Sequence, residues 1–93
     1  MVNDKINSLV IYDIVNDKQR IQFAKFMESY GVRVQKSAFE VRLNRRKMER
    51  MIMEIKNYVN NEDNVRLYKI YEKDDIKCWG KAHMLTNEEY III

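Results

Sequence analysis

The stretch Leu9-Val10-Ile11-Tyr12-Asp13-Ile14 decides the fold, because it is a continuous apolar run with an acid near its end. Continuous runs rich in β-branched and aromatic residues are typical of strands buried on both faces. We expect a strand over residues 6–14, central in its sheet, with Leu9, Ile11 and Asp13 on one face and the even-numbered residues on the other. A buried carboxylate is costly unless it is paired, hydrogen-bonded or bound to a cation, so Asp13 needs an explanation beyond packing.

The next segment predicts a helix followed by extended chain. Asn16 is a suitable N-cap for a helix over residues 17–30, and Gln19 stands where it would complete a capping box. Gly31 then supplies the stop of this helix. A second strand is expected from Val32, Val34 and the stretch from Ser37 to Leu43, in which apolar and charged side chains alternate.

A second helix is expected from its cap at Asn44 to about residue 60, because apolar residues recur there at helical spacing. They are Met48, Met51, Ile52, Ile55 and Val59. A strand over 65–71 and a short return strand over 76–79 complete the pattern. The order predicts an α+β fold, a ferredoxin-like β-α-β-β-α-β sandwich with both helices on one face of the sheet.

The chain ends in Tyr90-Ile91-Ile92-Ile93, an apolar and β-prone segment. An unpaired strand of this kind would promote aggregation, so we expect it to pair with a sheet edge, in its own subunit or in a partner. We therefore expect one domain over residues 1–93, with a core over 1–80 and a C-terminal extension and additional strand over 81–93. A homodimer would also cover the sheet face that the helices leave open.

The composition argues against several classes of protein. The 93 residues include one cysteine, Cys78, and one histidine, His83, which is too few for a disulfide framework, a zinc site or a Cys-His pair with supporting spacing. We interpret His83 as a solvated loop residue. No apolar stretch approaches the roughly 20 residues that cross a bilayer, and we expect no signal peptide, because no apolar h-region is visible before the first strand. We expect a cytoplasmic location and no membrane partner.

Positive charge is concentrated in residues 18–50, where ten Lys or Arg stand against three Glu, a net charge of +7 in a chain of net charge +3. Several of these cations fall in the first turns of the second helix, where the helix dipole disfavours them unless an anion is near. A bound phosphate backbone would supply that anion. The candidate nucleic-acid contacts are Arg20, Arg33, Lys36, Arg45, Arg46 and Arg50. The alternative is that these residues are ordinary solvated faces.

Asp13 is the best candidate for chemistry. A carboxylate at the end of a buried strand, near a helix N-terminus, can stay ionised and hold Mg²⁺, which activates water and offsets charge on a phosphodiester. One aspartate is a sparse metal site, but two copies that face each other across a two-fold axis could share one ion. The alternative is that Asp13 only accepts backbone N–H bonds from the turn into the first helix.

Several segments together resemble the family of CRISPR-associated protein 2. They are Tyr12-Asp13-Ile14, Asp17-Lys18 with Arg20, Gly31-Val32-Arg33-Val34-Gln35-Lys36-Ser37 with Phe39-Glu40, and Val65-Arg66-Leu67-Tyr68. The resemblance implies a homodimer whose sheets pack face to face and whose C-terminal strand adds to the neighbouring subunit's sheet. It also implies a role in spacer acquisition, in which the protein binds the double-stranded spacer precursor and bridges dimers of the integrase CRISPR-associated protein 1.

The same resemblance implies a Mg²⁺-dependent endonuclease acting on RNA or double-stranded DNA. Position by position, it assigns metal binding and catalysis to Asp13, a supporting role to Tyr12, and activity or substrate contact to Arg20, Arg33 and Phe39. The family usually has Asp-Asp before the Lys, whereas this chain has Asn16-Asp17, so a negative charge beside the expected metal is missing.

Three hypotheses follow for the function. The first is a DNA-bridging scaffold within an integration complex, and the second is a metal-dependent endonuclease. The third is a stand-alone, toxin-like, metal-dependent endoribonuclease of related fold.

Overall fold

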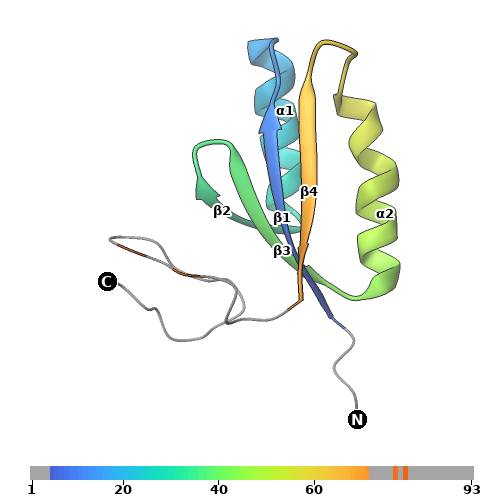
Figure 1. Ribbon diagram of the computed structural model, residues 1–93. Coiled ribbons are helices and arrows are strands. Elements are labelled where there is room, and N and C mark those ends of the chain that lie inside the picture. Colours follow the sequence, from blue (N-terminus) through green and yellow to red (C-terminus); the bar gives the residue numbers. More distant parts are fainter. Residues whose placement is uncertain (1–4, 72–76, 78, 80–93) are drawn as a thin grey trace.

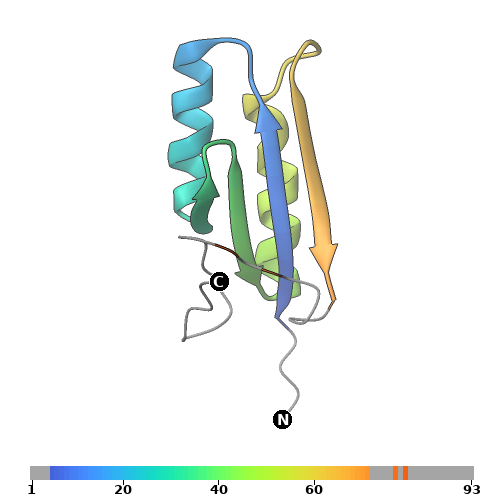
Figure 2. The ribbon, with the colours of Figure 1, turned by 60° about the vertical axis from the view of Figure 1, so that its left-hand side comes forward.

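The computed structural model describes residues 5–71, 77 and 79 and shows a four-stranded antiparallel sheet with two helices against one face (Figures 1 and 2). In chain order the elements are β1 (Ile6–Asp13), α1 (Asp17–Glu28), β2 (Gly31–Gln35), β3 (Ala38–Leu43), α2 (Arg45–Ile55), the 3₁₀ turn η1 (Lys56–Tyr58) and β4 (Asn64–Ile70). The strand order is β2-β3-β1-β4. This is the ferredoxin-like arrangement that the sequence predicts.

Strand β1 is central, as predicted, and its two faces differ in burial. Val10 and Tyr12 are buried against the helices, whereas Ile11 on the open face remains 41% exposed. The expectation of a strand buried on both faces is therefore only half right within one chain. The remaining core residues are Ile14 after β1, Phe23, Ala24 and Met27 of α1, Phe39, Val41 and Leu43 of β3, and Met48 and Met51 of α2.

Cross-strand pairing decides which features share an end of the molecule. Ile6 pairs with Leu43 of β3, and Asp13 pairs with Asn64 of β4. Because α2 begins directly after β3, its first turn lies near Ile6, where β1 begins. From Ile6 to Asp13 the strand rises about 23 Å at the usual rise per strand residue. In Figure 1, α2 starts at the bottom of the view and β1 ends at the top. The predicted basic residues of the first turn of α2 and the predicted metal ligand thus lie at opposite ends.

Helix α1 begins as the sequence predicts, but one of its expected contacts is wrong. The Asn16 side chain accepts the Gln19 N–H at 2.8 Å, which makes it the N-cap. The Gln19 side chain does not complete a capping box. It donates to the Tyr58 carbonyl and accepts from the Asn60 side-chain amide at 2.9 Å. Gln19 therefore joins the start of α1 to η1 and the loop after it, rather than capping its own helix.

Gly31 is the first residue of β2, and its role is close approach to β3 rather than helix termination. Helix α1 ends with Ser29 as its C-cap, in the right-handed helical region. A Cβ atom at position 31 would lie 2.2 Å from the Glu40 carbonyl oxygen and 2.6 Å from Val41 Cγ1. A backbone oxygen cannot move aside without disturbing the β2–β3 pairing, so only glycine fits. The prediction that Gly31 supplies the helix stop is wrong.

Helix α2 is shorter than predicted, because the chain tightens into η1 after Ile55. Asn44 caps it as expected by accepting the Lys47 N–H at 2.9 Å. Met48 and Met51 are buried, in agreement with the prediction that they fill the core. Ile52, which the sequence places in the same stripe, is 46% exposed. The buried face of α2 is therefore narrower than its apolar spacing suggests.

A further hydrogen bond joins the residue after the end of α1 to α2. The Tyr30 hydroxyl, just after α1, donates to Glu54 Oε1 of α2 at 2.7 Å. Partial burial of the phenol and its bond to the Glu54 carboxylate both raise the pKa of Tyr30 above its ordinary value. The neutral, donating form of the hydroxyl is therefore kept throughout the neutral pH range.

The remaining predicted strands have different outcomes. The chain between Val32 and Leu43 forms two strands, β2 and β3, and the strand expected at 65–71 is β4. The return strand at 76–79 lies largely outside the described residues, and the C-terminal extension at 81–93 lies wholly outside them. Neither helix in the described part of the chain is long and apolar enough to cross a membrane.

Replacing Gly31 with Ala tests the close approach of β2 to β3. The added methyl group should lower the free energy of unfolding by about 1–3 kcal/mol, the usual cost of overpacking. Urea denaturation measures this change. The matched control is Gln22→Ala on the exposed face of α1, which should change the same quantity by less than about 0.5 kcal/mol. Equal effects of the two substitutions would contradict the steric account.

Candidate functional site

Asp13 is the last residue of β1 and is exposed on the open face of the sheet. It pairs with Asn64 of β4, and both residues line a shallow hollow of about 270 Å³ together with Arg66 and Tyr68. Within the described ranges, the Asp13 carboxylate has no hydrogen-bond or ion-pair partner. The interpretation that Asp13 serves only to accept N–H bonds from the following turn is therefore wrong. No side chain or backbone group of the described residues therefore blocks the carboxylate by bonding to it.

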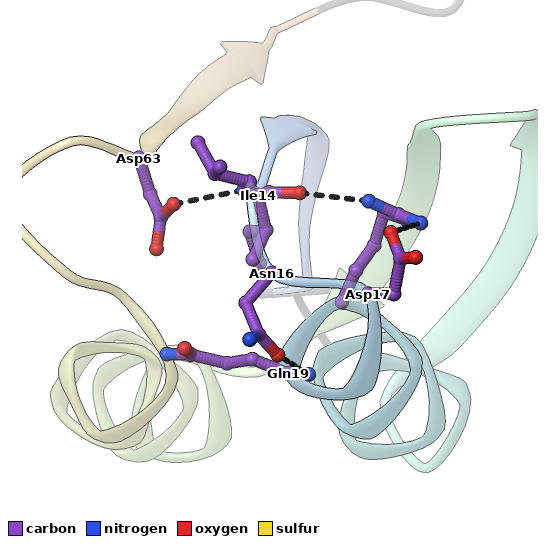
Figure 3. Close-up of polar contacts among 7 residues, drawn as sticks. Ile14, Asn16, Asp17, Gln19 and Asp63 are labelled. Carbon is purple, nitrogen blue, oxygen red and sulfur yellow. Dashed lines mark hydrogen bonds and ion pairs between the residues drawn. The ribbon is translucent and has the colours of Figure 1, made fainter.

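Asp63 takes the role that this interpretation gave to Asp13. Its Oδ1 accepts the Val15 N–H at 2.9 Å, and its Oδ2 accepts the Asn60 N–H at 2.8 Å. Figure 3 shows Asp63 reaching the turn after β1 from the chain that leads into β4. The carboxylate thus ties the segment after Asp13 to the loop before β4.

Arg20 approaches the same turn from α1. Its Nη1 donates to the Ile14 carbonyl oxygen at 3.0 Å, and its Nη2 forms an ion pair with Asp17 Oδ1 at 2.6 Å (Figure 3). The predicted nucleic-acid contact therefore has two partners within its own chain. Ion pairs between exposed groups are worth little, but the bond to a backbone carbonyl fixes where the guanidinium lies.

Tyr12 lies on the helix face, on the opposite side of β1 from the Asp13 carboxylate. Its ring contacts Phe23 and Phe39, with centroid distances of 4.9 and 6.0 Å. Its hydroxyl donates to the Lys36 carbonyl at 3.4 Å and accepts from Arg33 Nη2 at 3.3 Å. Tyr12 thus connects the end of β1 to the β2–β3 hairpin, so any support it gives to Asp13 acts through the backbone.

Phe39 and Arg33 form one unit with Tyr12. Phe39 is completely buried, and the Arg33 guanidinium carbon lies 5.5 Å from the centre of its ring. A cation over an aromatic face is attracted to it. Phe39 therefore has no surface to offer a substrate within this chain, whereas Arg33 is exposed and is oriented by Phe39 and Tyr12.

The six predicted nucleic-acid contacts fall into three places. Arg20 lies beside the end of β1, and Arg33 and Lys36 lie on the β2–β3 hairpin. Arg45, Arg46 and Arg50 lie on α2, which has no acid in its first turn. Arg45 is paired weakly with Glu49 at 3.8 Å. Arg46 and Arg50 are exposed and form no ion pair with any described residue.

The donor set around Asp13 is sparse for a metal ion. Among the described residues, no three His, Cys, Asp or Glu side chains lie close enough to hold one. Asp13 has the Asn64 amide across the strand, while Asn16 is committed to capping α1. Mg²⁺ takes oxygen ligands, usually one or two carboxylates with several waters. The described part of one chain therefore offers only part of the oxygen set that Mg²⁺ usually takes.

Three residues of this region were not predicted from the sequence: Asp63, Asn64 and Arg66. Arg66 lies opposite Ile11 on the open face and donates to the Tyr68 hydroxyl at 3.4 Å. Alternation along β4 is visible in the sequence and places Asn64 and Arg66 on one face. The register that brings this face beside Asp13 is not.

These features define an α+β, ferredoxin-like domain with an exposed carboxylate at the end of its central strand and a basic second helix. Residues 7–78 match the family model of the CRISPR associated protein Cas2. The chain belongs to this family.

Individual relatives agree with this assignment. The CRISPR-associated endoribonuclease Cas2 of Mycobacterium tuberculosis H37Rv is 33% identical over 87 residues, covering 94% of this chain and 77% of the relative. A crystal structure of cas2 has a TM-score of 0.72 at 26% identity, covering 95% of this chain and 99% of that one. A chain in a solved partial Cas6-RT-Cas1–Cas2 complex has a TM-score of 0.59 at 34% identity, covering 87% and 91%.

Replacing Tyr12 with Phe tests whether this residue serves the fold or the chemistry. The substitution removes the hydroxyl that joins Lys36 and Arg33 but keeps the buried ring. It should lower the free energy of unfolding by about 0.5–1.5 kcal/mol, the usual worth of a hydrogen bond, as measured by urea denaturation. Any Asp13-dependent cleavage should stay within two-fold of wild type below the unfolding transition. A large loss of cleavage by a folded variant would show that the hydroxyl acts in the chemistry.

Proposed function

We propose that this chain is a spacer-acquisition subunit that works as a homodimer, binds duplex DNA and bridges dimers of the integrase CRISPR-associated protein 1. Family membership supports the pathway, and the similarity to a chain in a solved Cas1–Cas2 complex supports the partner. The observation that carries DNA binding is the pair of α2 arginines, Arg46 and Arg50, that form no ion pair with any described residue. Arg46 and Arg50 are one helical turn apart on its exposed surface, where they can contact successive phosphates.

The open face of the sheet supports association with a second copy. Ile11 of β1, Val32 of β2 and Tyr68 of β4 are each 38–47% exposed on this face. Apolar side chains gathered on one sheet face favour burial against a partner. Asp13 lies on this same face, so two-fold packing through it would bring two carboxylates toward each other.

A metal-dependent endonuclease acting on RNA or double-stranded DNA is the second candidate function. It is favoured by the exposed Asp13 carboxylate, which has no polar partner among the described residues and lies in the hollow beside Asn64 and Arg66. The names of the relatives as endoribonucleases point the same way. When bound between two Asp13 carboxylates, Mg²⁺ would activate water and offset phosphate charge. The chain's own contribution is to hold Asp13 and to place cations nearby.

Reversing the charge of the α2 arginines tests the scaffold. The double substitution Arg46→Glu with Arg50→Glu should weaken binding to a spacer-length duplex at least tenfold. It should also make the binding constant depend less steeply on salt concentration, and it should prevent a ternary complex with the integrase. Fluorescence anisotropy and size-exclusion chromatography measure these effects. The fold should survive, because both side chains are exposed and Glu at position 46, in the first turn of α2, suits the helix dipole.

The matched control for this test is Lys18→Glu with Lys25→Glu, which makes the same change of net charge on the exposed surface of α1. The control should weaken binding by less than three-fold. If both pairs of substitutions weaken binding equally, the duplex responds to net charge alone, and the assignment to α2 is wrong.

Replacing Asp13 with Asn separates the two candidate functions. Asp13 is exposed and unpaired within the described chain, so Asp13→Asn should leave unfolding, duplex binding and the ternary complex within error of wild type. Mg²⁺-dependent cleavage of RNA or duplex DNA should fall at least 100-fold, to the level seen in EDTA. Loss of duplex binding in this variant would contradict the scaffold, and cleavage that persists would place catalysis on another residue.

Growth measurements separate the stand-alone toxin hypothesis from both. Expression of a toxin-like endoribonuclease would arrest growth by cleaving messenger RNA, and the arrest would disappear with Asp13→Asn. We expect no arrest from the wild-type chain.

A further inference from the structure

One peptide unit next to Asp13 is held at both of its polar ends. The Ile14 carbonyl and the Val15 N–H belong to the same peptide group. Arg20 donates to the carbonyl oxygen at 3.0 Å, and Asp63 accepts the N–H at 2.9 Å (Figure 3). The cation faces the partial negative charge of the carbonyl oxygen, and the anion faces the partial positive charge of the N–H. Each interaction increases the polarisation of the peptide, so the two hydrogen bonds strengthen each other.

The two charged side chains are themselves fixed by their neighbours. Arg20 is paired with Asp17 at 2.6 Å. Asp63 uses its second oxygen for the Asn60 N–H, and its own N–H donates to the Asn60 carbonyl at 3.0 Å. The peptide is therefore tied to α1 on one side and to the turn before β4 on the other.

This peptide immediately follows Asp13 in the chain. The β1–β4 ladder has its last pair at Asp13 and Asn64, and the bond from Val15 to Asp63 extends the connection between the two segments past that pair. Without it, the last residue of β1 would be at a free strand end, where backbone bonds open most easily. The backbone of Asp13 would then be less constrained, and so would the direction of its carboxylate.

We propose that Asp63 is a positioning residue for Asp13. By holding the Ile14–Val15 peptide opposite Arg20, it keeps the Asp13 carboxylate beside Asn64 and Arg66, where the proposed metal-dependent cleavage would use it. The consequence for cleavage rests on the proposed endonuclease function, whereas the hold on the backbone does not. Arg20 acts through the same peptide, which gives this predicted nucleic-acid contact a second role.

The experiment compares Asp63→Ala and Asp63→Asn with a control, Glu62→Gln. Glu62 is the preceding residue, is exposed and forms no hydrogen bond or ion pair with other described residues, so the control removes the same charge without removing a bond. Asp63→Asn keeps one carbonyl oxygen as an acceptor and should fall between wild type and Asp63→Ala. All variants are compared as dimers well below their unfolding transitions.

Two readouts report the position of the backbone without any cleavage. In Asp63→Ala, hydrogen exchange of the Val15 amide should accelerate at least tenfold, while amides in the middle of β1 exchange as in wild type. The carboxyl carbon resonance of Asp13 should shift in this variant and stay unchanged in Glu62→Gln. Unchanged Val15 exchange or an unchanged Asp13 resonance in Asp63→Ala would overturn the proposal.

The third readout is cleavage in saturating Mg²⁺. Asp63→Ala should lower kcat at least tenfold with KM for the nucleic acid within two-fold, because the variant disturbs a reacting carboxylate and no binding surface. Wild-type kcat in a folded Asp63→Ala would overturn the proposal. If the wild-type chain cleaves nothing, the endonuclease function fails on its own, and the two backbone readouts still decide whether Asp63 positions Asp13.

A double-mutant cycle with Arg20→Gln tests the shared peptide. Arg20 and Asp63 have no bond between them in the structure, so their effects would add if they acted independently. Because both act on one peptide, the double variant should accelerate Val15 exchange by no more than three-fold beyond the stronger single variant. If the accelerations of Val15 exchange in the two single variants multiply in the double variant, the shared mechanism is wrong.

Discussion

The alternation of side chains along β1 is the constraint on which the rest of the molecule depends. This strand pairs on both sides, with β3 and with β4, so its register orients the whole sheet. Val10 and Tyr12 must face the helices to close the core, and that requirement forces Asp13 onto the opposite face. The carboxylate is exposed because its neighbours are buried. A slip of one residue would bury Asp13 and expose Tyr12, which explains how packing alone fixes the side on which chemistry can occur.

The same face carries two unfinished features. Ile11 and Tyr68 leave apolar area open to solvent, and Asp13 supplies one carboxylate where Mg²⁺ usually needs a fuller oxygen set. Either feature alone would be weak support for association. Because they lie on one face, a single two-fold contact would cover the apolar area and add a second carboxylate. In the proposed dimer, the metal site would exist only as long as the two subunits stay together.

Local patterns in the sequence predict the elements, whereas contacts between distant segments account for the errors at Gln19 and Gly31. Period-two and helical spacing are visible in a window of a few residues, and they place β1, α1, the start of α2 and β4 close to their observed bounds. Gln19 was assigned a local capping role, but its partner Tyr58 lies 39 residues away. Gly31 was assigned to the helix end, but the atom that excludes a side chain belongs to Glu40 of β3. The role of Asp63 was not predicted, because the Val15 N–H from which it accepts a hydrogen bond is 48 residues away in the sequence.

The distribution of charge along the molecule separates binding from chemistry. Arg46 lies at the end of the sheet where β1 starts, and Asp13 lies where β1 stops, so about the length of a strand divides them. A duplex held by α2 therefore does not have to place a phosphodiester at Asp13, and no contact on α2 depends on the Asp13 carboxylate. Under the proposed function, this separation would let duplex binding persist even where the proposed metal site is weak. Where the family resemblance predicts a second acid beside Asp17, this chain has the uncharged Asn16, which caps α1. The missing charge would weaken the proposed metal site at the Asp13 end of the molecule, and this site lies far from the arginines at the start of α2.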